Sequence, residues 1–229
     1  MKKKIFAVLL AAFAMTANAQ IYVGGQLGFS NSSVNPDIEG AKSISGTSFK
    51  ILPEVGYKLN DQWAVGIQVG YSQGYSAFGT FDVNDLRSLA KTAGSAVFDV
   101  LSSSDAFEVK LNAFRVAPYA RYTFLKAGNF DFFVEGGIAY TNIKAKNLNR
   151  FGGILGALPE DPTVNAFEIA VRPGIIFNVS EHAQVVAKIG ALGYQNAKFD
   201  AGLGFKPSLN RFGLEVDGDD LSLGFNYQF

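Results

Sequence analysis

The chain has 229 residues, the size of a single all-β domain, and it contains no cysteine. The lack of cysteine excludes a disulfide framework, a thiolate metal site, a cysteine nucleophile and a lipid-anchored cysteine. Charged residues make up only 17% of the sequence and aromatic residues 14%, which is unusual for a soluble surface, and the balance of 20 basic and 20 acidic residues gives no cationic excess for nucleic acid.

Residues 1–19 have the parts of a secretory signal peptide. Three lysines at 2–4 precede an apolar run over 5–15, and Ala-Asn-Ala at 17–19 forms an A-x-A cleavage site. The apolar run is roughly 11 residues, whereas a helix needs about 20 to span a bilayer. We therefore expect residues 1–19 to be removed and residues 20–229 to form one mature domain with 17 basic and 20 acidic residues.

Beyond residue 20, bulky apolar residues alternate with small or polar ones. Between Trp63 and Tyr75, the odd positions are mostly bulky and apolar, while the even positions are Ala, Gly, Gln or Ser. A period of two indicates strands with two unlike faces. The pattern predicts eight strands, at about 20–30, 49–59, 63–75, 114–124, 130–141, 167–177, 183–194 and 213–229.

The connections between these segments alternate in length. Short turns rich in Asn, Asp, Gly and Ser lie at 60–62, 126–129 and 179–182. Long connections lie at about 31–46, 76–107, 145–165 and 195–212. This order predicts an all-β fold, an eight-stranded antiparallel up-and-down transmembrane β-barrel with long extracellular loops and short periplasmic turns.

Alternation alone also fits a soluble, lipocalin-like barrel with an apolar interior. Two observations favour an apolar exterior. The second face is rich in Gly, Ala and Ser, which suits the crowded lumen of a narrow barrel. Aromatic residues also bound several strands at ten-residue intervals, as in Phe114 to Phe124 and Phe130 to Tyr140. Ten residues tilted by about 40° rise about 25 Å, the height of the lipid-facing band.

These aromatic residues predict two girdles at the membrane interfaces. The core of a soluble sandwich is the alternative interpretation. The girdle near the periplasmic turns would contain Tyr57, Trp63, Phe124, Phe130, Phe177 and Tyr227. The girdle near the long loops would contain Phe49, Tyr75, Phe114, Tyr140 and Phe167.

The signal peptide, the eight alternating segments and the final Phe225-Asn226-Tyr227-Gln228-Phe229 resemble the small outer-membrane barrels of the OmpX, OmpW and OmpA-barrel type. The resemblance implies a location in the outer membrane of a Gram-negative bacterium, in contact with outer-membrane lipid and lipopolysaccharide. It also implies that Phe225, Tyr227 and Phe229 form an assembly signal for the barrel insertion machinery.

Charged residues of both signs fall on the inward face. An isolated buried charge costs several kcal/mol, so these groups should pair. The lumen of an eight-stranded barrel is just wide enough for side chains to fill. We expect one network that plugs the lumen, with a gated narrow conductance or a polar floor beneath a ligand pocket as alternatives. Its members would be Glu54, Arg115, Arg121, Glu135, Glu168, Arg172 and Lys188.

No catalytic, cofactor or metal motif is apparent in the sequence. The single histidine, His182, falls in a predicted periplasmic turn, at the wrong end for the known enzymatic barrels. The acidic stretch at 217–220 could hold a divalent cation but lacks EF-hand spacing. We expect no enzymatic activity and no cofactor.

Two of the long loops contain apolar patterns. Residues 86–101 have roughly helical spacing, and residues 151–158 are unusually apolar for an outer loop. These loops could pack on each other, line an apolar entrance or contact a partner. The function expected is structural, or surface interaction through the extracellular loops. The alternative is narrow porin-like or OmpW-like passage of small solutes or hydrophobic ligands.

Overall fold

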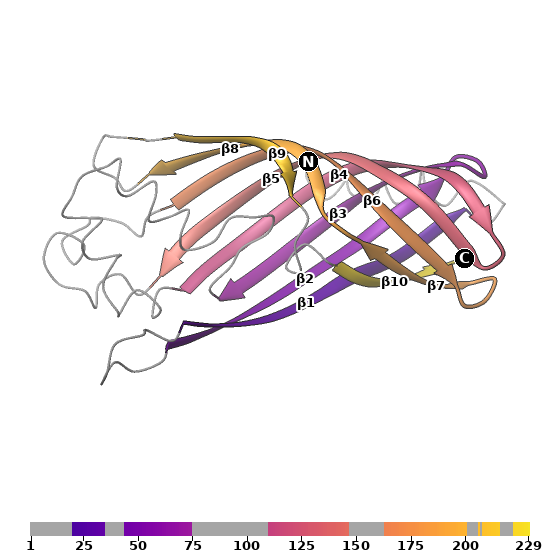
Figure 1. Ribbon diagram of the computed structural model, residues 1–229, viewed down its shortest axis with the longest axis horizontal. Coiled ribbons are helices and arrows are strands. Elements are labelled where there is room, and N and C mark those ends of the chain that lie inside the picture. Colours follow the sequence, from indigo (N-terminus) through magenta and orange to yellow (C-terminus); the bar gives the residue numbers. More distant parts are fainter. Residues whose placement is uncertain are drawn as a thin grey trace, which may run out of the picture.

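All regular structure in the described part of the chain is β-strand (Figure 1). The computed structural model describes residues 20–34, 44–74, 110–146, 163–200, 206, 208–215 and 222–229. Within these residues no helix is long and apolar enough to cross a membrane. Among the features predicted above, the signal peptide, Tyr75, the apolar loop patterns and the acidic stretch lie outside the described residues.

Ten strands follow one another along the chain, and every pairing between them is antiparallel. Their bounds are Ile21–Val34 (β1), Ile44–Lys58 (β2), Trp63–Gly74 (β3), Lys110–Ala127 (β4), Phe130–Lys146 (β5), Thr163–Asn178 (β6), Ala183–Lys188 (β7), Ala191–Asp200 (β8), Ser208–Glu215 (β9) and Ser222–Gln228 (β10).

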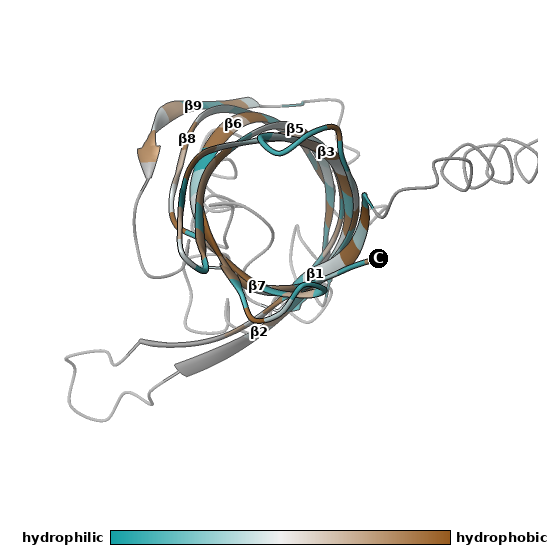
Figure 2. Cartoon of the chain, turned by 90° about the vertical axis from the view of Figure 1, so that its right-hand side faces the viewer, coloured by the Kyte–Doolittle hydropathy of each residue, from teal (hydrophilic) through white to brown (hydrophobic). Residues whose placement is uncertain are grey.

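The ten strands form a closed barrel with eight strand positions, and we call each position a stave. Both β7 and β8 pair with β6, so together they form the seventh stave. Strands β9 and β10 pair with β8 and β7 respectively and form the eighth. The ring closes where β10 pairs with β1. Figure 2, viewed along the barrel, shows this ring. The predicted eight-stranded antiparallel barrel is confirmed.

The assignment of the two faces is also confirmed. Bulky residues such as Trp63, Ile67 and Phe167 are exposed on the outside, as expected for side chains that contact lipid. The alternate residues are buried in the lumen, and they include Ala64 and Gln68. The barrel is therefore apolar outside and partly polar inside, opposite to the soluble alternative.

The predicted lengths of several outer loops are wrong. The proposed loop at 195–212 instead contains the end of β8 and the start of β9, and strands also extend into the proposed loops at 31–46 and 145–165. Beyond the girdle the outward residues become polar while the inward ones are apolar, as in Asn142 and Ile143 on β5. The pattern of bulky apolar residues facing outward therefore ends while backbone pairing continues. The outward apolar pattern in the sequence extends only as far as the lipid, whereas the strand itself is longer.

The seventh stave is interrupted at Ile189 and Gly190, where the sequence predicted a continuous strand. The neighbouring residue on β6 is Pro173, which has no N–H to donate to the ladder. The Ile189 N–H still donates to the Pro173 carbonyl at 3.3 Å, and Gly190 adopts a φ of 65°. The proline and this left-handed glycine together account for the break.

Candidate functional site

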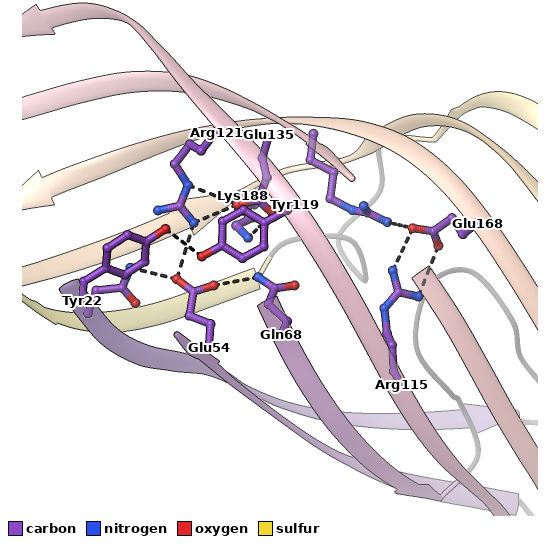
Figure 3. Close-up of polar contacts among 11 residues, drawn as sticks. Tyr22, Glu54, Gln68, Arg115, Tyr119, Arg121, Glu135, Glu168 and Lys188 are labelled. Atoms are coloured by element: carbon purple, nitrogen blue, oxygen red, sulfur yellow. Dashed lines mark hydrogen bonds and ion pairs between the residues drawn. The ribbon is translucent and has the colours of Figure 1, made fainter. Parts of the chain in front are cut away.

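Four charged side chains meet in the lumen (Figure 3). They lie toward the strand ends that adjoin the short turns. The Arg121 guanidinium on β4 donates to Glu135 on β5 at 2.8 and 3.1 Å and to Glu54 on β2 at 3.4 Å. The Lys188 ammonium on β7 donates to the other oxygen of Glu135. We call these residues the inner cluster: Glu54, Arg121, Glu135 and Lys188.

Neutral side chains complete the hydrogen bonds of the inner cluster. Gln68 on β3 donates to Glu54 Oε2 at 2.7 Å, and Asn226 on β10 donates to Glu54 Oε1 at 2.8 Å. All four charged groups are buried, and the two cations balance the two carboxylates. A buried ion pair is tolerated only when its hydrogen bonds are satisfied in this way.

An aromatic frame surrounds Arg121. The Tyr22 and Tyr119 hydroxyls form a hydrogen bond at 2.7 Å. The guanidinium carbon lies 4.6 Å from the Phe133 ring centroid, 5.3 Å from that of Tyr119 and 5.7 Å from that of Tyr22. These distances permit cation–π attraction, which is strongest for a desolvated cation. The three rings are buried in the lumen together with the inner cluster.

Glycines on neighbouring strands make room for these rings. A Cβ added at Gly56 would lie 2.1 Å from the Tyr22 ring, and one at Gly66 would lie 2.5 Å from the Tyr119 ring. Either distance is far below van der Waals contact. The glycines on the inward face therefore let the tyrosine rings lie across the wall of the barrel.

A second group, the outer cluster, lies further toward the long connections. Arg115 donates to the two oxygens of Glu168 at 2.8 and 3.3 Å and to the Thr141 hydroxyl at 3.4 Å. Arg172 also donates to Glu168. The outer cluster is Arg115, Glu168 and Arg172, with one carboxylate for two cations. The Arg172 side chain is 24% exposed, so its extra charge is partly solvated.

The structure thus places all seven predicted residues in the lumen, but in two ion-paired groups where the sequence predicted one network. The division reflects the register, because Arg121 lies opposite Glu135 whereas Arg115 lies opposite Thr141. Sequence reasoning missed the neutral partners, since it counted only charges. These neutral partners could have been found from the alternating pattern, because it places them on the inward face. The missed residues are Tyr22, Gln68, Tyr119, Phe133 and Asn226.

Ten of the eleven predicted girdle residues lie in the described strands, all at outward positions. At the turn end, Trp63 contacts Tyr122 with ring centroids 4.8 Å apart, and Phe130 contacts Phe177 at 5.0 Å. Phe124 lies at a register shift between Thr123 and Leu125. Such a shift is where a strand changes direction and twist.

The last strand closes the barrel and presents Phe225, Tyr227 and Phe229 to the outside. Their role as an assembly signal stays a prediction. His182 stacks on Tyr227, and its Nδ1 lies 2.9 Å from the Gln228 carbonyl. These contacts give the histidine a structural role at the turn end. Across the described strands and turns, no three His, Cys, Asp or Glu side chains are grouped as a metal site would require.

Comparison with protein families gives one match over nearly the whole chain. A family model described as "Outer membrane protein beta-barrel domain" matches residues 5–229. No curated protein sequence matches the chain.

Several solved structures are similar in fold. Neisserial surface protein A (NspA) of Neisseria is 15% identical, covering 91% of this chain and 97% of its own, with a TM-score of 0.42. The N-terminal β-barrel domain of Pseudomonas aeruginosa OprF is 12% identical, covering 93% and 100%, with a TM-score of 0.44. Yersinia pestis Ail, solved with a heparin analogue, is 13% identical, covering 93% and 99%, with a TM-score of 0.38.

Proposed function

The chain belongs to the family of outer membrane protein β-barrel domains, and on that premise we propose that it is a non-enzymatic scaffold with a closed lumen. Its task would be structural, or surface interaction through the segments that join the strands at the outer end. Functional residues are disproportionately found on loops held by a rigid framework. The family places the barrel in the bacterial outer membrane.

The observation that carries this proposal is the inner cluster. Its ion pairs and hydrogen bonds connect β2, β3, β4, β5, β7 and β10, which lie around the ring. Side chains that bond across the lumen tie opposite walls together and occupy the path that a solute would take. A filled lumen favours a scaffold over a diffusion pore.

Single-channel recording in planar bilayers tests the closed lumen. The refolded wild-type barrel is expected to show no stepwise conductance. The paired variant Arg121→Ala/Glu135→Ala removes one cation and one anion, keeps the inner cluster neutral and should produce small steps, because its two truncated side chains leave a water-filled path. Conducting wild-type protein would contradict the scaffold, and the paired variant controls for successful insertion.

A second candidate function, passage of small hydrophobic ligands, is favoured by the outer part of the wall. Among the described residues, β1 pairs with β10 only as far as Leu27, and β9 pairs only with β8. The outward residues there, Phe29 (75% exposed), Phe212 (77%) and Leu214 (68%), are more exposed than Ile169 (50%), which has strands on both sides. This apolar seam would offer a lateral route between the lipid and the outer lumen.

A tryptophan reporter separates the two candidates. In a Trp63→Phe background, Phe199→Trp places the reporter at a buried position of β8 on the luminal face. If ligands enter, brominated decanol should quench this tryptophan saturably, whereas brominated phospholipid at the same bromine content should not. Equal, non-saturating quenching by both probes would eliminate the passage function and leave the scaffold.

A further inference from the structure

Strands β5, β6 and β8 continue beyond the outer aromatic girdle on one side of the barrel. Tyr140 on β5 lies opposite Phe167 on β6, and Tyr194 on β8 lies opposite Ile169. All four side chains are exposed at outward positions. Because tyrosines gather where lipid meets water, this level marks the headgroup region of the outer leaflet. Outward residues further along these strands face lipid headgroups.

The first such residues form a hydrogen-bonded set of amides. The Tyr140 hydroxyl and the Asn142 amide both donate to Asn165 Oδ1, at 2.7 and 2.8 Å. The arrangement is repeated between β8 and β9, where the Tyr194 hydroxyl and an asparagine two residues further on donate to Asn210 Oδ1, at 2.8 and 2.7 Å. We call these four asparagines the amide row: Asn142, Asn165, Asn196 and Asn210.

Exposed lysines follow the amide row on the same outward face. Lys144 and Lys146 extend from β5, and Lys198 extends from β8. In the register, Lys144 lies opposite Thr163 and Lys198 opposite Asn165, so β6 alone separates them. With strands about 4.8 Å apart and about 3.3 Å per residue, their backbones are roughly 12 Å apart. Two flexible side chains can converge on one headgroup across this distance.

The charges on this face are not balanced. Of the described outward residues on β5, β6, β8 and β9 beyond the girdle, Asp200 alone carries a carboxylate, and its Oδ2 forms an ion pair with Lys206 at 2.7 Å. The three lysines therefore give the face a net positive charge next to the lipid. Below them the outward residues Ile138, Phe167 and Ile169 are apolar. A lipid with an anionic headgroup fits this arrangement, because its headgroup would lie beside the lysines and its acyl chains beside the apolar residues.

We propose that Lys144, Lys198 and the amide row bind the phosphorylated disaccharide of lipid A in the outer leaflet. The ammonium groups would contact the phosphates as point charges. The amides would hydrogen-bond to the sugar and to acyl carbonyls, and the acyl chains would lie along β5 and β6. The site is independent of the lumen, so it holds whether the barrel is a scaffold or a passage.

Native mass spectrometry of the mature barrel in detergent micelles, titrated with purified lipid A, tests the proposal. Each lysine near a charged lipid surface contributes about 5-fold in affinity, so the Kd of Lys144→Gln/Lys198→Gln should rise about 25-fold. Lys126→Gln is the matched control, because Lys126 is an exposed lysine at the opposite end of the barrel. Its Kd should equal that of the wild type.

Two further probes define the ligand. Lipid A stripped of its phosphates should bind the wild type as weakly as intact lipid A binds the double variant. Phosphatidylglycerol at the same phosphate concentration should compete poorly, because it lacks the sugar that the amide row would contact. A double variant with wild-type affinity, or full competition by phosphatidylglycerol, would overturn the site.

Discussion

Replacing Arg121 with methionine is expected to lower the free energy of unfolding by about 3 to 5 kcal/mol. The guanidinium neutralises two buried carboxylates and contacts three aromatic rings. Without it, Glu54 and Glu135 share only the Lys188 ammonium, and one carboxylate stays buried without a counter-charge. The cost comes mainly from that stranded charge, since methionine fills much of the same space.

Unfolding of the barrel in lipid vesicles by guanidinium chloride measures this loss of unfolding free energy. Trp63 is the only tryptophan and lies in the girdle at the turn end, so its fluorescence reports the transition. Lys126→Met removes an exposed cation and should leave the midpoint within experimental error. The double variant Arg121→Met/Glu135→Gln restores neutrality and should be more stable than Arg121→Met alone. Equal stability of all these proteins would show that the inner cluster contributes nothing.

The inner cluster could be predicted in part from the sequence. Alternation places Glu54, Arg121 and Glu135 on one face, and the cost of buried charge requires them to pair. Which residues pair depends on register and on closure of the ring. Glu54 and Asn226 are 172 residues apart and meet only because the first and last staves join. No local pattern specifies such a contact.

The strand ends beyond the membrane were predicted least well, and the reason is physical. The pattern used to predict the strands, bulky apolar residues outward and small or polar residues inward, holds only where the outer face contacts lipid. On β5 this contrast ends near Tyr140, while pairing with β6 continues to Lys144. The polar outward residues that interrupt the apolar pattern, and so keep this part of the strand from being predicted, include those of the amide row. The part of the barrel least evident in the sequence therefore carries the proposed lipid site.

Replacing Gly56 with alanine should destabilise the barrel by about 1 to 3 kcal/mol, the usual cost of overpacking. The added methyl group would meet the Tyr22 ring, which its hydrogen bond to Tyr119 holds in place. The three atoms nearest to that methyl all belong to Tyr22. In a Tyr22→Ala background, Gly56→Ala should therefore cost almost nothing, and the double-mutant cycle should give a coupling close to the full single-variant loss.

Gly66 supplies the matched contrast. A Cβ there would meet the Tyr119 ring at 2.5 Å but also the backbone carbonyl of Val55 at 2.8 Å. Removing the ring with Tyr119→Ala leaves the carbonyl in place, so Gly66→Ala should stay costly in that background. Unfolding midpoints for both cycles test the difference. If Gly56→Ala were equally destabilising in the Tyr22→Ala background, the idea that ring-on-glycine packing fixes these aromatic side chains around Arg121 would be wrong.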